Sequence, residues 1–69
     1  MRLKEIRTEN SMKQAELALH FNVNTRTIRK WENEESSPTI NQLIEIANYF
    51  NVSIDYLVGN DDVPNRKES

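Results

Sequence analysis

The sequence has no cysteine, one glycine, two prolines and one histidine. Without cysteine there is no disulfide framework, no thiol nucleophile and no cysteine-based zinc site. Because His20 is the only imidazole, a histidine-rich metal site is also excluded. With so little glycine, capping side chains must set most helix boundaries.

Long apolar runs are missing too. No segment approaches the roughly 20 apolar residues that span a bilayer, and charged residues follow Met1 where a signal peptide would be apolar. A chain of 69 residues buries only roughly 60% of its unfolded surface, which leaves no second core and no deep catalytic cleft. We expect a small cytoplasmic domain that is not an enzyme and uses no cofactor, metal, membrane or small-molecule substrate.

The net charge of −2 argues against a nucleic-acid partner, but the charges are unevenly distributed. Residues 1–31 carry seven basic and three acidic groups, whereas residues 32–69 carry two basic and eight acidic groups. The two parts therefore have net charges of +4 and −6. Such asymmetry indicates a polyanion-binding face in the first part.

Four helix starts are marked by an apolar residue before the cap and another five residues later. The caps are Lys13, Asn24, Thr39 and Ser53; at Lys13, which cannot accept a hydrogen bond, Glu16 can accept from the backbone N–H instead. With the helical spacing of Leu3 and Ile6, the pattern predicts an all-α fold of five helices. Their predicted ranges are 2–9, 14–21, 25–33, 40–50 and 54–58, in a domain of residues 1–59 followed by a polar, flexible tail of residues 60–69.

The fourth predicted helix has apolar residues at the spacing of a buried face. This pattern predicts burial of Ile40, Leu43, Ile44, Ala47 and Phe50.

Residues 21–24 are too few for anything but a tight turn between the second and third helices, with Asn22 predicted in the left-handed conformation. Two short helices joined in this way are typical of a helix-turn-helix unit. On the third helix Ile28 and Trp31 define an inward face, opposite Arg26, Lys30 and Asn33. No acidic residue lies in residues 17–31, so within that segment no acid is available to pair with these cations at the i,i+4 spacing, which favours contact with DNA.

At these positions the chain resembles the Cro/CI-type helix-turn-helix family, also called XRE-type or phage-repressor-like. The resemblance covers about residues 2–59 and is carried by the stretches 14–18, 23–24, 27–28, 31–33, 38–39 and 52–59. It implies that the third helix enters the major groove while the second crosses the backbone.

The resemblance also implies a sequence-specific transcriptional regulator, a prokaryotic or phage-encoded repressor that binds a double-stranded operator as a homodimer and is nucleoid-associated when bound. It implies roles for individual residues as well. Arg7 and Glu32 match a structural ion pair, and Ile54 and Tyr56 match dimer contacts. Base edges would be read by Thr25, Arg26 and Arg29 or Lys30, and phosphates would be bound by Gln14, Thr27 and Asn33. The chain departs from the family pattern at Ser11 and Glu34, where glycine is frequent.

A second interpretation remains open. The acidic second part of the chain and the apolar Leu19, at a position that is usually polar in the family, are also typical of a protein-interaction module. Such a module, antitoxin-like or anti-repressor, would bind DNA weakly or not at all.

Overall fold

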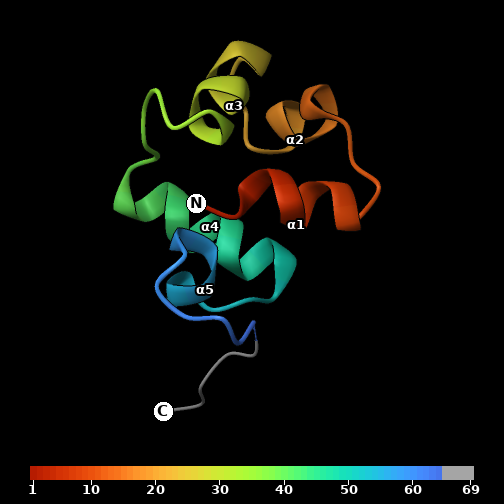
Figure 1. Cartoon of the computed structure of the whole chain (residues 1–69). Helices are drawn as coiled ribbons and strands as arrows, with labels where there is room; N and C mark the ends of the chain where they lie inside the picture. The colour runs from red at the N-terminus through yellow and green to blue at the C-terminus, as the bar shows by residue number, and fades with distance from the viewer. Residues whose placement is uncertain (65–69) are drawn as a thin grey trace. The chain divides into compact units, whose positions relative to one another are not determined.

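The structure is a computed structural model that describes residues 1–64. Within this range it contains five α-helices and no β-strand (Figure 1), which confirms the predicted all-α class. Each helix begins and ends within one residue of its predicted bounds. The helices are α1 (Leu3–Glu9), α2 (Gln14–His20), α3 (Thr25–Glu32), α4 (Ile40–Phe50) and α5 (Ile54–Val58).

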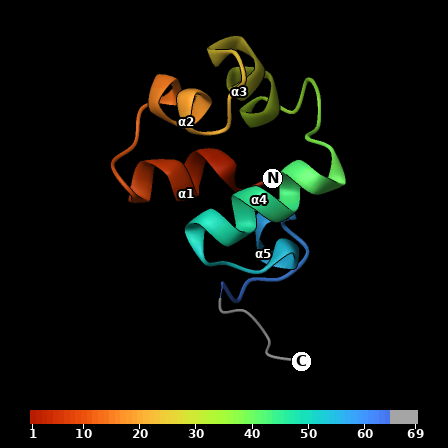
Figure 2. The same ribbon diagram turned by 180° about the vertical axis from the view of Figure 1, so that it is seen from behind.

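The first of two compact units consists of Met1 and Leu3–Ser37 and contains α1, α2 and α3. In this unit α3 contacts both α1 and α2, and the views from opposite sides agree on this arrangement (Figures 1 and 2). The inward direction predicted for Ile28 and Trp31 is confirmed, because both are buried. The buried apolar residues of the unit are Leu3, Ile6, Leu17, Ala18, Ile28 and Trp31.

Side-chain and backbone caps determine where α2 and α3 begin. Asn24 Oδ1 accepts a hydrogen bond of 2.9 Å from the Arg26 N–H, as expected of an N-cap residue. At α2 the carboxylate of Glu16 accepts from the Lys13 N–H at 3.0 Å. The Lys13 ammonium has no acceptor site, so this start uses only the reciprocal half of a capping box.

The second unit consists of Arg2 and the residues from Pro38 onward, and contains α4 and α5, which contact each other. A complete capping box begins α4: Thr39 Oγ1 accepts from the Gln42 N–H at 3.2 Å, and Gln42 Oε1 accepts from the Thr39 N–H at 2.8 Å. At α5, Ser53 Oγ accepts from the Tyr56 N–H at 3.0 Å. The buried apolar residues of this unit are Pro38, Ile46, Ala47, Val52 and Leu57.

The predicted buried face of α4 is wrong at two positions. Ile40 is 64% exposed and Ile44 is 40% exposed, whereas Ile46, absent from the predicted face, is fully buried. The apolar residues of α4 extend around more than half of the helix, so their periodicity allows two overlapping faces. In the structure, the face that carries Ile46 and Ala47 is the one that is buried.

Residues 60–64 return along the second unit. Ser53 N–H donates to Pro64 O at 3.2 Å, and the guanidinium of Arg2 pairs with Asp62 at 2.7 Å. Arg2 also donates from Nε to Tyr56 O at 3.0 Å and lies over the Tyr56 ring, 4.6 Å from its centroid. Residues 65–69, the rest of the predicted tail, lie outside the described residues, so the flexible tail stays a prediction.

Four residues other than glycine adopt positive φ angles within residues 1–64. Asn22 has φ 55°, which confirms the left-handed turn between α2 and α3. Ser11 and Glu34, with φ 57° and 60°, are the two positions at which the sequence departs from the family resemblance. A side chain in this conformation costs roughly 1–2 kcal/mol, which glycine avoids.

We predict that Ser11→Gly raises the free energy of unfolding by about 1 kcal/mol, because the native φ is then unstrained. Urea denaturation followed by circular dichroism measures the change. Ser37→Gly is the matched control, since Ser37 is also exposed but has a negative φ. An equal or larger gain in Ser37→Gly would contradict the strain at Ser11.

Candidate nucleic-acid interface

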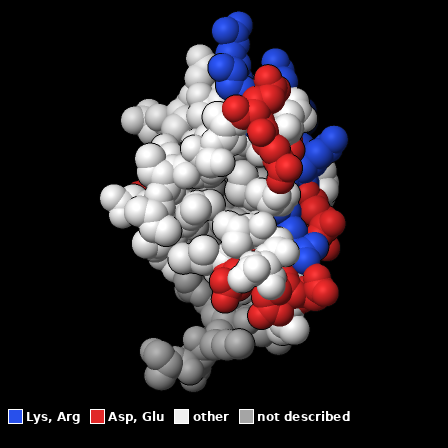
Figure 3. All heavy atoms as spheres, turned by 60° about the vertical axis from the view of Figure 1, so that its left-hand side comes forward, with Lys and Arg blue, Asp and Glu red and all other residues white. Residues whose placement is uncertain are grey.

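The outward face of α3 presents the side chains that the sequence assigned to DNA. Arg26, Arg29, Lys30 and Asn33 are exposed, and Thr25 and Thr27 are half-buried. Within residues 1–64 the structure records no hydrogen bond or ion pair from the side chains of the three cations. Figure 3 shows Lys and Arg side chains projecting at the level of α3. The three cations of α3 are therefore available to an anionic ligand.

The start of α3 is held by the turn that precedes it. Val23 N–H donates to Ala18 O at 2.9 Å, and the left-handed Asn22 reverses the chain before the cap. Asn24 then accepts from the backbone of Arg26 through its side chain. The first turn of α3, with Thr25 and Arg26, is thereby tied to the end of α2.

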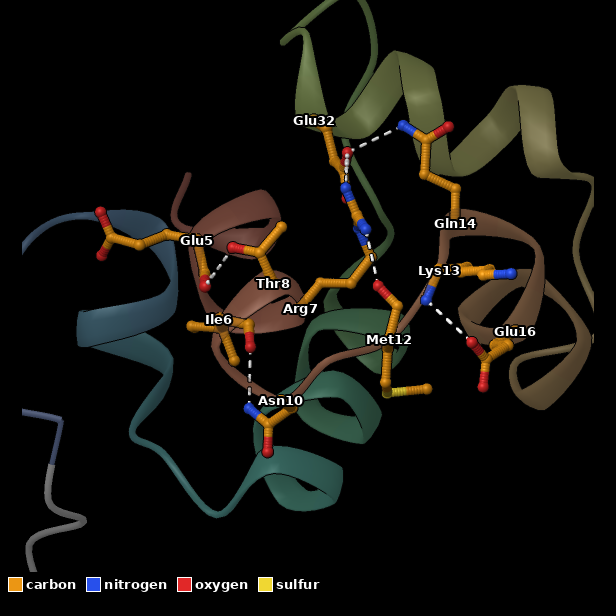
Figure 4. A network of polar contacts seen from close by, with 10 residues as sticks. All are labelled: Glu5, Ile6, Arg7, Thr8, Asn10, Met12, Lys13, Gln14, Glu16 and Glu32. Carbon is orange, nitrogen blue, oxygen red and sulfur yellow. Dashed lines mark hydrogen bonds and ion pairs between the residues drawn. The ribbon is translucent and has the colours of Figure 1, made fainter.

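The end of α3 is held by a bidentate ion pair between α1 and α3. Arg7 Nε lies 2.5 Å from Glu32 Oε2, and Arg7 Nη2 lies 3.1 Å from Glu32 Oε1 (Figure 4). The side chains are 10% and 1% exposed, respectively. Arg7 Nη1 also donates to Met12 O at 2.7 Å, in the loop between α1 and α2. The ion pair implied by the family resemblance is confirmed, and it leaves Arg7 occupied within the protein.

Gln14 takes part in the same network, which the sequence did not reveal. Its Nε2 donates to Glu32 Oε1 at 2.9 Å (Figure 4). Gln14 is the first residue of α2 and Glu32 is the last residue of α3, 18 positions later. No periodicity within one helix relates two such positions. The phosphate contact assigned to Gln14 stays a prediction, with one N–H of the amide already bonded.

Acidic residues follow the cationic face directly. Glu34 Oε1 lies 2.5 Å from the amino group of Met1, and its side chain is 70% exposed. The hydrogen bond from this ammonium, together with its charge, lowers the pKa of Glu34. Glu35 is exposed, so the loop after α3 keeps acidic character beside the cations.

The two residues assigned to a dimer interface, Ile54 and Tyr56, are half-buried in the second unit. The ring of Tyr56 is covered on one face by the guanidinium of Arg2. Their role between two copies stays a prediction.

Two other kinds of site are absent from the described part of the chain. None of its helices has the length and apolar character that crossing a membrane requires. Residues 1–64 also contain no group of three or more His, Asp or Glu side chains placed to hold a metal ion.

Comparisons with known proteins agree with this geometry. Residues 3–57 match the helix-turn-helix family. Over 68 residues the chain is 34% identical to the HTH-type transcriptional regulator ImmR of Bacillus subtilis strain 168, a match that covers 99% of this chain and 54% of that protein. The chain thus spans about half the length of this relative. No solved structure gives a significant match.

The family match covers all of α1 to α4 and most of α5, including the turn and α3. The resemblance seen in the residues is therefore confirmed, and the chain belongs to the helix-turn-helix family of the XRE, or Cro/CI, type.

Proposed function

We propose that the protein is a sequence-specific DNA-binding transcriptional regulator that places α3 in the major groove. The observation that carries the proposal is the outward face of α3, where three cations lie exposed without partners in the described chain. An α-helix fits the major groove, and arginine, lysine and threonine can bind base edges and phosphates there. The regulator works by binding, with no catalytic step and no cofactor, and acts in the cytoplasm on the operator.

The positions of the side chains on α3 support a division of roles. Thr25 and Arg26 lie on its first turn, which enters the groove first in this class of motif, and Arg29 or Lys30 lies one turn later. We assign these residues to base edges. Thr27, beside that face, and Asn33, at the end of α3, are assigned to phosphates together with Gln14 at the start of α2.

The name of the ImmR relative supports a role in transcription, and repression by occupying a promoter is the mode we assign. A second copy would double the number of contacts. Because the loop after α3 is acidic, one protomer gains little from non-specific attraction to phosphates. We therefore propose that a homodimer binds the operator, with Ile54 and Tyr56 near the contact between copies.

Arg26→Ala tests the assignment of base reading. We expect about 5- to 150-fold weaker binding to the operator, equivalent to about 1–3 kcal/mol, and relaxed preference at one base position. The operator is first selected from a pool of random duplexes, and affinity is measured by fluorescence anisotropy.

The matched control is Lys4→Ala, which removes the same charge from an exposed position on α1. Lys4→Ala should weaken operator binding less than Arg26→Ala does, and it should leave base preference unchanged. Operator binding by Arg26→Ala as tight as that of the parent protein would show that Arg26 does not read a base.

Dimeric binding predicts two half-sites about 10 base pairs apart, centre to centre, related by approximate two-fold symmetry. Footprinting on the selected operator measures this spacing. A single protected half-site would contradict the homodimer.

A protein-interaction module is the second candidate, and Leu19, 83% exposed on α2, is the observation that favours it. The salt dependence of duplex binding distinguishes the two functions. A DNA-binding protein should bind random duplex at low salt, with log K falling against log salt by about 1 for each cation on a phosphate. No binding to random or selected duplex at low salt would favour the interaction module.

A further inference from the structure

The helices α2 and α3 are joined at two places. The turn of residues 21–24 connects the end of α2 to the start of α3. The hydrogen bond between Gln14 and Glu32 connects the start of α2 to the end of α3 (Figure 4). The two helices, the turn and this bond therefore form a closed ring of residues 14–32.

The Glu32 end of this ring is fixed. The Glu32 side chain is 1% exposed, and its carboxylate accepts two hydrogen bonds from Arg7 in addition to the one from Gln14. Arg7 is in turn bonded to Met12 O, next to the start of α2. Gln14 is thus bonded to an anchored carboxylate and not to a mobile surface side chain.

We propose that Gln14 is a positioning residue that sets the orientation of α3 relative to α2, and through it the placement on DNA of the base-reading side chains of α3. This inference rests on the proposed function and deepens it, because it makes Gln14 a determinant of sequence discrimination. A contact to phosphate alone would contribute equally to all sequences.

The dimensions of α3 show why a single bond at its end matters. Its eight residues make a helix roughly 12 Å long. A tilt of about 5° about one end moves the other end by about 1 Å, which is enough to lose a directional hydrogen bond to a base edge. The turn holds the first end of α3 against α2, and the Arg7 pair holds the second end against α1. The bond from Gln14 to Glu32 ties this second end to α2 and so restricts the tilt between α2 and α3.

The chemistry of the amide suits this role. The carboxylate of Glu32 accepts only, so the NH₂ group of Gln14 must face it. That bond orients the amide and leaves its second N–H for a phosphate oxygen. Methionine has a similar length but no donor, and glutamate would place a second carboxylate against Glu32.

The free protein provides the first test, which does not depend on DNA. One Nε2 proton of Gln14 should show the downfield shift and slow exchange of a hydrogen bond to a carboxylate. In Gln14→Met, backbone resonances along α3 should move and hydrogen exchange at its last turn should become about three- to tenfold faster. Two Nε2 protons with the shifts of a free amide would overturn the proposal, even if the variant does not fold.

The second test compares operator with random duplex. Gln14→Met should weaken operator binding more than random binding, so that the ratio of the two affinities falls about three- to tenfold. An equal loss on both duplexes would leave Gln14 as a phosphate contact alone and overturn the proposal. A parent protein that binds neither duplex contradicts the proposed function, while the resonances of the free protein still decide the role of Gln14 in placing α3.

Gln42→Met is the matched control, because it removes a glutamine side-chain hydrogen bond from the start of another helix, α4. It should lower the melting temperature but leave the affinity ratio unchanged. A fall in the ratio as large as that of Gln14→Met would show that general destabilisation, and not the orientation of α3, explains the effect.

Discussion

The buried ion pair between Arg7 and Glu32 is the interaction on which the unit of α1, α2 and α3 depends. It joins the first and third helices directly, and its additional hydrogen bonds to Met12 and Gln14 include the start of the second. Removing one partner of such a pair costs about 3–5 kcal/mol, because the other charge stays buried and unpaired. The orientation of α3 is therefore tied to the stability of the fold.

Pairing of charges within the protein explains how a chain with a net charge of −2 can present a cationic surface. Two of the basic residues in the first part of the chain are used internally: Arg7 on Glu32, and Arg2 on Asp62 and the Tyr56 ring. The outward face of α3 carries no acid within the helix, and Glu32, the acid that ends it, is buried and paired with Arg7. The net charge counts all ionised groups of the chain, but the pairing of charges determines which cations remain available to bind a ligand.

Predictions from the sequence succeeded where a local signal determines the outcome. Asn24, Thr39 and Ser53 begin helices because each cap bonds an N–H two or three residues away, and Asn22 tolerates its left-handed φ without help from distant residues. They were wrong for Ile40 and Ile44, because periodicity shows that a helix has an apolar side but not which part of a broad side is covered. The bond from Gln14 to Glu32 was missed, since no local rule relates residues 18 positions apart.

The sequence by itself determined the class of the protein, its five helices, the turn before α3 and the cations on its outward face, because caps, turn residues and helical period act over a few neighbouring positions. The family resemblance added the partner of Arg7. Only the tertiary structure decided which side of α4 is buried and which side chains surround Glu32. These depend on how helices pack in three dimensions, where side chains far apart in the chain compete for the same buried space and the same hydrogen-bond acceptors.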